Sequence, residues 1–192
     1  MVKDMRPSGH FYSGLIFWFI LFILNNSYSY YNTFFFITAV IVLDLDYLGK
    51  FIFVEQNHRR YLSHSPVLWS LILIGAFFFQ NNLLFWISLG FLVHVLVDTI
   101  DWGIFLLPTK NARITPHLLE VHESMKIEKD FSRVYWNNKV IFSIEVTLFL
   151  ITTFVIIYLT ILSINFYLLV YLSAIFVITS SLSFIDYKNS ID

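Results

Sequence analysis

The sequence lacks cysteine and has few charged residues. Without cysteine, disulfide bonds and thiolate metal sites are both excluded, so any metal must be held by histidine, carboxylate or backbone oxygen. Only 13% of the residues are charged and 58% are hydrophobic, with a mean hydropathy of +0.73, whereas about one quarter of a soluble domain is charged. Basic residues form no long block, which excludes a nucleic-acid-binding stripe. The composition therefore predicts a membrane protein with several spans.

Apolar runs predict an all-α fold with about six transmembrane helices. Two of the runs fall short of the roughly 20 residues needed to cross the hydrocarbon core. Five or four spans are therefore the alternatives, if a short run is re-entrant. The predicted spans are 11–27, 29–45, 66–80, 83–107, 140–162 and 164–185.

The basic residues support this arrangement of spans. With six spans, all 12 lysines and arginines fall on one side of the membrane, in residues 1–10, 46–65, 108–139 and 186–192. The positive-inside rule then places both termini in the cytoplasm and the protein in the plasma or inner membrane. The third of these segments is expected to contain a cytoplasmic amphipathic helix that lies on the membrane surface.

The last two predicted spans carry almost no polar residues. Glu145, near the start of the first of them, is the exception, and we expect it at the membrane interface. The chain is therefore predicted to have two parts. Residues 1–139 form a membrane-embedded part with the ionisable groups, and residues 140–192 form a helical hairpin for packing or for a homodimer.

Ionisable residues of metal-ligand types gather in short motifs of the first part. At a bilayer centre each would cost about 2.5 to 3.5 kcal/mol on insertion scales, so their presence indicates a functional site. His94 and Asp98 stand at positions i and i+4 and share one helix face. The predicted topology brings the cluster together near the cytoplasmic interface. The candidate metal ligands are His10, Asp44, His58, His64, His94 and Asp98, and the further carboxylates are Asp46 and Asp101.

Each motif also has a purely structural interpretation. The Asp44–Asp46 motif could simply end a span, and the Arg59–Arg60 pair could anchor a loop on anionic lipid. Ser65 and Pro66 suit the N-cap and the first position of a helix. The group His94–Asp101 is harder to explain in this way, because three ionisable residues there follow helical spacing in an apolar run.

The residue types in the cluster indicate which metal it would bind. Imidazoles combined with carboxylates favour zinc, with manganese or iron as alternatives, over calcium and magnesium, which prefer oxygen ligands alone. The candidate ligands exceed the needs of one tetrahedral ion, so two or more ions are compatible with them. Two metals about 3.5 to 4 Å apart could clamp a phosphoryl oxygen. Arg59 and Arg60 could bind the phosphate bidentately.

The order of the motifs resembles that of a known family. Over roughly residues 9–108 the chain is similar to the membrane-bound, metal-dependent hydrolases of the LexA-binding inner-membrane type. The resemblance implies a helical multipass hydrolase whose substrate is generally not established. Two departures affect individual ligands: Tyr47 stands where the family often has histidine, and the run after His58 is longer and lacks a glycine. The matching motifs are Gly9-His10, Asp44-Leu-Asp46, His58-Arg59-Arg60, Ser63-His64-Ser65, and His94-Val-Leu-Val-Asp98 with Gly103 and Pro108.

A more distant similarity is to the all-helical zinc-dependent phospholipase C and P1 nuclease group. It implies hydrolysis of a phosphodiester or phospholipid. The residues corresponding to that group's metal ligands are His10, Asp44, His58, His94 and Asp98. The group also uses later ligands, and although the spacing here does not reproduce its later motif, the candidates are His117, Glu120, His122 and Glu123.

These patterns together predict a metal-dependent hydrolase that acts on a phosphoester or lipid-linked substrate at the cytoplasmic interface. Asp46 or Asp101 would be the general base, and Arg59 or Arg60 would steady the anionic substrate. One alternative is a proton or divalent-metal transporter that uses the same residues as a relay. However, no charged residue lies closer to the outer side of the membrane than His94, so a transport path would have no ionisable groups there. The other alternative is a non-catalytic membrane anchor that binds a soluble partner.

Overall fold

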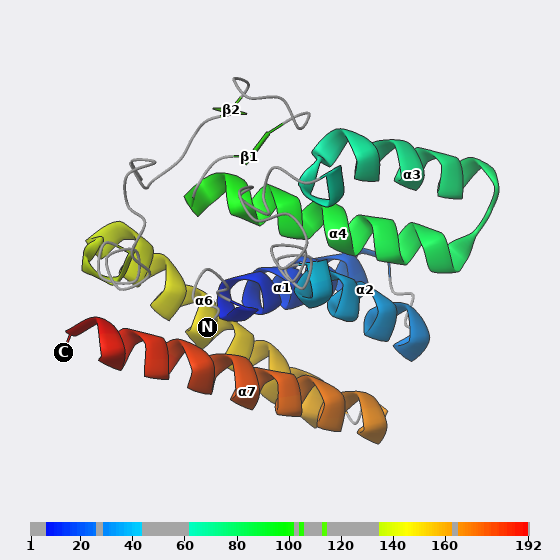
Figure 1. Ribbon diagram of the computed structural model, residues 1–192. Helices are drawn as coiled ribbons and strands as arrows, with labels where there is room; N and C mark the ends of the chain where they lie inside the picture. The colour runs from blue at the N-terminus through cyan, green and yellow to red at the C-terminus, as the bar shows by residue number, and fades with distance from the viewer. Residues whose placement is uncertain are drawn as a thin grey trace. The chain divides into compact units, whose positions relative to one another are not determined.

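The described part of the protein is almost entirely helical. The computed structural model describes residues 7–25, 29–43, 62–101, 104–105, 113–114, 135–162 and 165–191. The helices (Figure 1) are α1 (Pro7–Asn25), α2 (Tyr30–Val42), the 3-10 turn η3 (Leu62–His64), α3 (Pro66–Phe78), α4 (Asn82–Asp101), α6 (Lys139–Ile161) and α7 (Phe166–Ile191). The predicted helical fold is therefore confirmed for these residues. One short ladder was not predicted: β1 (Ile104–Phe105) pairs antiparallel with β2 (Arg113–Ile114).

Each predicted span contains one apolar helix, and fewer than six of the described helices are long enough to cross a membrane. Among the described helices, three are long and apolar enough to cross a membrane, namely α4, α6 and α7. At 1.5 Å per residue, the 23 residues of α6 and the 26 of α7 exceed the hydrocarbon thickness of roughly 30 Å. The 13 residues of α2 and of α3 reach only roughly 20 Å. The apolar stretch of α1, Ser8–Leu24, is also among the shorter ones.

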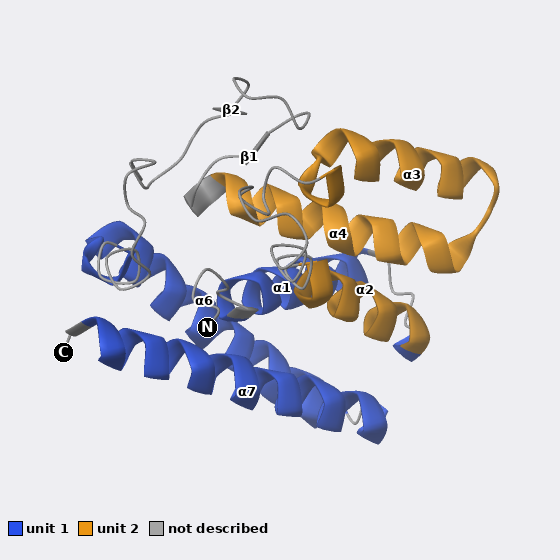
Figure 2. Ribbon diagram, viewed as in Figure 1, with its two compact units in different colours: residues 1–30, 119–192 blue, residues 31–118 orange. Residues whose placement is uncertain are grey.

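The chain divides into two compact units (Figure 2). Unit 1 consists of Met1–Tyr30 and Leu119–Asp192, and unit 2 consists of Tyr31–Leu118. Unit 1 thus holds α1, α6 and α7, whereas unit 2 holds α2, η3, α3 and α4. This grouping differs from the predicted boundary after residue 139, because α1 packs against both α6 and α7.

Unit 1 is held together by apolar packing and by hydrogen bonds between helices. Tyr12 on α1 is 3% exposed and lies beside Ser180 on α7, with 2.7 Å between the two hydroxyl oxygens. One helical turn earlier on α1, the hydroxyls of Ser8 and Ser183 are also hydrogen-bonded. The ring of Tyr12 meets Phe149 of α6 edge to face, with the ring centroids 6.1 Å apart. Hydroxyl pairs of this kind join helices in apolar surroundings, where water is not present to compete.

The start of α6 follows from a cap that the sequence supplies. The Asn138 side-chain oxygen accepts hydrogen bonds from the backbone N–H of Val140 at 3.0 Å and of Ile141 at 3.3 Å. These bonds satisfy two of the amide groups that have no partner within the helix itself. Most of the predicted amphipathic helix before this point, residues 115–134, lies outside the described residues.

In unit 2, α3 and α4 form a helical hairpin. Gln80 in the connection has a φ of 53°, in the left-handed region, and the backbone N–H of Asn81 bonds to the carbonyl of Ala76 at 2.9 Å. Trp69 of α3 packs on Phe91 of α4, with ring centroids 4.2 Å apart. This pair also packs on a small apolar cluster formed by Leu43 and Val95.

Candidate metal centre

His64 is positioned by the junction between η3 and α3. The backbone N–H of Ser65 bonds to the carbonyl of Leu62 at 3.0 Å, which closes the 3-10 turn. The Trp69 indole N–H donates to the carbonyl of Ser63 at 2.5 Å, so the turn is also fastened to α3. The Ser65 hydroxyl caps α3 by accepting from the Leu68 N–H at 3.5 Å, and Pro66 occupies the first turn. The predicted helix start is confirmed, and it leaves His64 buried at 1% exposure.

His94 and Asp98 are both completely buried on α4. Their i, i+4 spacing places them on one face of the helix, as the sequence predicted. The surrounding residues are apolar: Val95 is fully buried between them in sequence, and Trp69 and Phe91 pack against it. A carboxylate in such a place requires compensation from charged or hydrogen-bonding neighbours.

Both imidazoles approach the same oxygen of Asp98. The His64 Nε2 and the His94 Nε2 each lie 3.6 Å from Asp98 Oδ2. The two rings meet edge to face, with centroids 5.4 Å apart and an angle of 74° between their planes. A direct hydrogen bond between such groups would be about 2.7 to 2.9 Å long. In a tetrahedral zinc site, where bonds to N and O are about 2.0 Å, neighbouring ligand atoms are about 3.3 Å apart. The observed spacing is closer to the second value.

A hydrogen bond to α2 determines which nitrogen of His94 faces Asp98. The His94 Nδ1 lies 2.7 Å from the carbonyl oxygen of Val40. A carbonyl can only accept, so Nδ1 must carry the proton and donate it. In the neutral ring, Nε2 then has its lone pair, and this atom is the one directed at Asp98. Metal-binding histidines are typically fixed in this way, by a backbone carbonyl on the second ring nitrogen.

His94 and Asp98 belong to a group of residues that could hold a metal ion. His94 and Asp98 offer ligand atoms that lie within 4.8 Å of each other, and His64 adds a second imidazole from a different element. Two imidazoles and one carboxylate suit zinc, and manganese or iron as alternatives. The cofactor prediction is supported at this coarse level: a buried His/Asp group is present that could take a metal.

The other predicted site residues are distributed differently. His10 lies on α1 in unit 1, where it is 3% exposed, and its role as a ligand stays a prediction. Asp101 is the last residue of α4, and its side chain lies outside the described residues. The remaining candidates also lie outside them, namely Asp44, Asp46, His58, Arg59, Arg60, His117, Glu120, His122 and Glu123.

Sequence reasoning missed two supports of the centre and the environment of one carboxylate. The Val40 carbonyl has no signal in the sequence, because any residue supplies a backbone oxygen. Gly90, where α4 meets α2, could have been noticed as a glycine in an apolar helix. Glu145, expected at the membrane interface, is only 7% exposed within unit 1 and accepts a 2.6 Å hydrogen bond from the Tyr135 hydroxyl.

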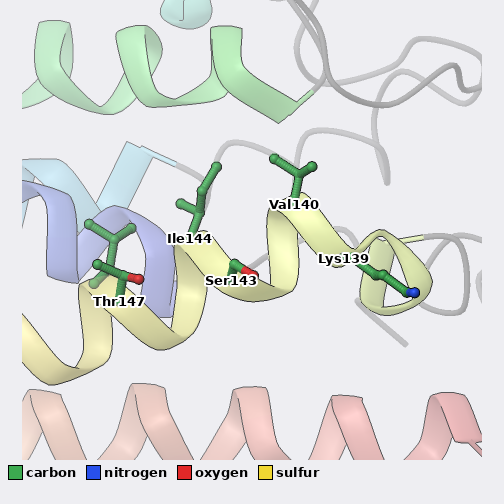
Figure 3. Close-up of a pocket in the computed structure, with 6 residues that line it drawn as sticks. Lys139, Val140, Ser143, Ile144 and Thr147 are labelled. Carbon is green, nitrogen blue, oxygen red and sulfur yellow. The ribbon is translucent and has the colours of Figure 1, made fainter.

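A pocket along α6 is separate from these residues (Figure 3). The described residues that line it all belong to α6 and include one charged group, Lys139, but no histidine or carboxylate. Its polar residues Ser143 and Thr147 follow Lys139 at successive helical turns. The described residues of this pocket therefore include no donors of a metal site.

The chain matches no protein-family model, and no curated protein or solved structure is significantly similar to it. The resemblance to membrane-bound metal-dependent hydrolases thus stays a prediction that rests on the motifs alone.

Proposed function

We propose that the chain is a membrane-bound, metal-dependent hydrolase whose metal is held by His64, His94 and Asp98. The observation that carries the proposal is the approach of two imidazole Nε2 atoms to one carboxylate oxygen, each at 3.6 Å, in a strongly apolar chain. Burying three ionisable groups together is costly without a charge that they share. A divalent cation would compensate the carboxylate and use the lone pairs of both rings.

The types of ligand suggest which role each residue of the centre would have. A bound divalent metal supplies a water of lowered pKa and polarises a phosphoryl oxygen. Asp98 contributes the negative charge, and the Val40 carbonyl holds the His94 ring with Nε2 toward the centre. Three protein ligands leave one position of a tetrahedral shell for water or substrate, as catalytic zinc sites do.

Residues outside the described part complete the proposal. Asp44 and His58 would serve as ligands of a second ion. Asp46 or Asp101 would act as the general base, and Arg59 or Arg60 would bind the anionic substrate. The presence of helices long and apolar enough to cross a membrane supports an amphiphilic or lipid-linked phosphoester as the substrate class. The one-sided basic residues favour a site at the cytoplasmic face.

Metal analysis of the detergent-purified protein tests the proposal. We expect about one ion of zinc, manganese or iron per chain, or more, in the wild type. The double variant His94→Ala/Asp98→Ala and the isosteric Asp98→Asn should retain only background metal. Glu145→Gln is the matched control, because it removes a buried carboxylate from the other unit and should keep the metal. A wild-type protein that stays metal-free after incubation with these ions would contradict the proposal.

Activity separates hydrolysis from the transport alternative. A model phosphodiester and phospholipid vesicles serve as substrates, and we expect metal-dependent cleavage that a chelator abolishes and added metal restores. Proteoliposomes made from the same protein should show no Zn²⁺ or proton flux that depends on Asp98. Flux without cleavage would instead assign the buried group to transport.

A further inference from the structure

The side of α4 that carries His94 follows α2 over four successive turns. Near the start of α4, the Asn82 side-chain amide donates to the side-chain oxygen Oδ1 of Asn32 at 3.1 Å. One turn later Trp86 meets Phe36 edge to face, with ring centroids 6.2 Å apart. After a further two turns, His94 reaches the Val40 carbonyl. The two helices therefore advance in the same direction, and the hydrogen bond of His94 depends on how closely they approach.

Gly90 occupies the remaining turn, between Trp86 and His94, and there the backbone of α2 lies directly against α4. A Cβ atom at Gly90 would lie 2.5 Å from the carbonyl oxygen of Phe36 and 2.8 Å from the Cβ of Ala39. Real Cβ atoms essentially never show contacts below 3.0 Å. One of the two neighbours is backbone, so it cannot yield without moving α2 itself. Only glycine fits this position at the observed helix separation.

We infer that Gly90 is a positioning residue of the metal centre, a role that rests on the proposed function. It allows α4 to approach α2 so closely that His94 Nδ1 donates to Val40, and this bond aims Nε2 at Asp98. A side chain at position 90 would push the helices apart one turn from His94. The ring would then lose its fixed orientation, although both ligands would remain in the sequence.

Gly90→Ala tests this role, with Gly75→Ala as the matched control. Gly75 lies in α3, and a Cβ there would meet nothing within 4 Å, so both variants gain the same helix propensity but only one introduces a clash. Zn²⁺ affinity is measured on the full-length protein in detergent by competition with a chelator. We expect Gly90→Ala to lose about 10- to 100-fold in affinity, the range known for supporting partners of metal ligands. Gly75→Ala should bind as the wild type does.

The Co²⁺-loaded protein supplies a readout that a merely structural role would not change. At saturating Co²⁺, the visible absorption bands report ligand geometry, so Gly90→Ala should shift or weaken them. Ala39→Gly in the Gly90→Ala background should restore part of the affinity, because it removes the contact with Ala39 but not the one with Phe36. If Gly90→Ala does not fold, Ala39→Val tests the inference in its place. This variant enlarges the same contact from the side of α2 and should also lower Zn²⁺ affinity.

The outcomes are distinguishable. Wild-type affinity and an unchanged Co²⁺ spectrum in Gly90→Ala would overturn the inference, as would wild-type affinity in Ala39→Val if Gly90→Ala is unfolded. If the wild type and Gly75→Ala bind neither Zn²⁺ nor Co²⁺, the proposed function itself fails.

Discussion

Among the described residues two carboxylates are buried, one in each unit, and their surroundings differ. Glu145 in unit 1 accepts a hydrogen bond from the Tyr135 hydroxyl at 2.6 Å, and the absence of a side chain at Gly9 makes room for it, since a Cβ there would lie 3.0 Å from its oxygen. Asp98 in unit 2 instead has two imidazole nitrogens at 3.6 Å. One arrangement has the length of a hydrogen bond, and the other has the spacing of metal ligands.

The difference shows that burial alone does not identify a functional site. Other polar contacts of unit 1 resemble that of Glu145, such as the 2.8 Å bond from the Trp136 indole N–H to Asp186. These two hydrogen bonds join the turn before α6 to α6 itself and to α7, and they resemble the hydrogen bonds that hold transmembrane helices together. The polar group of unit 2 joins η3 and α4 through imidazole nitrogens, and the His94 Nε2 has a lone pair in the neutral ring. The carboxylate of unit 1 thus has a hydrogen-bonding role, and we propose a ligand role for that of unit 2.

The largest expected effect is the stabilisation of the protein by metal. A ligand that binds only the folded state stabilises it by about 2.7 kcal/mol when its concentration is 100 times Kd. We expect Zn²⁺ to raise the free energy of unfolding of the wild type by this order, as measured by SDS-induced unfolding in mixed micelles. Asp98→Asn should lose the increment, because it removes the charge that the cation compensates. Glu145→Gln should keep it, even if its stability without metal is lower.

An equal response of Asp98→Asn and the wild type to Zn²⁺ would remove the distinction between the two carboxylates. A response lost in Glu145→Gln and kept in Asp98→Asn would reverse it, and would move the metal site to unit 1.

Much of the fold could be predicted because it depends on local patterns. Apolar runs located each helix, since a segment with no polar residues must satisfy its backbone internally. Ser65 and Pro66 gave the start of α3, because a cap acts within four residues of its own position. The pairing of His94 with Asp98 followed from helix periodicity in the same way. The sequence did not show that only three of the described helices are long enough to cross a membrane, because an apolar run does not show where its helix ends.

The parts that could not be predicted depend on residues far apart in the sequence. The Val40 carbonyl and His94 are 54 positions apart, and a backbone acceptor leaves no mark in the sequence. The role of Gly90 appears only when α2 is placed against it. Glu145 is at an interfacial position by hydropathy, whereas its partner Tyr135 precedes the helix and becomes visible only in the folded unit.

An intermediate effect is expected from Tyr135→Phe. This variant removes the hydroxyl that donates to Glu145 and leaves the size of the ring unchanged. Depriving a buried acceptor of its donor costs about 1 to 3 kcal/mol, so the free energy of unfolding should fall by that amount. Metal content should not change, because the pair belongs to unit 1. Tyr167→Phe is the matched control: Tyr167 is 81% exposed on α7, and its loss should change stability by less than about 0.5 kcal/mol. Similar values for both variants would show that the Glu145 contact contributes nothing.

The smallest effect is expected from Ser65→Ala, which touches the support of His64 without touching a ligand. Loss of an N-cap typically costs about 1 kcal/mol, and Ser65→Asp should restore most of it, because aspartate caps equally well. Ser143→Ala, at an exposed position of α6, controls for the loss of a hydroxyl and should leave stability unchanged. Zn²⁺ affinity should fall less in Ser65→Ala than in any variant of the contact between α2 and α4, because the Trp69 indole still holds the turn through the Ser63 carbonyl. A larger loss of affinity than of stability would mean that the cap, and not the indole, holds His64 in place.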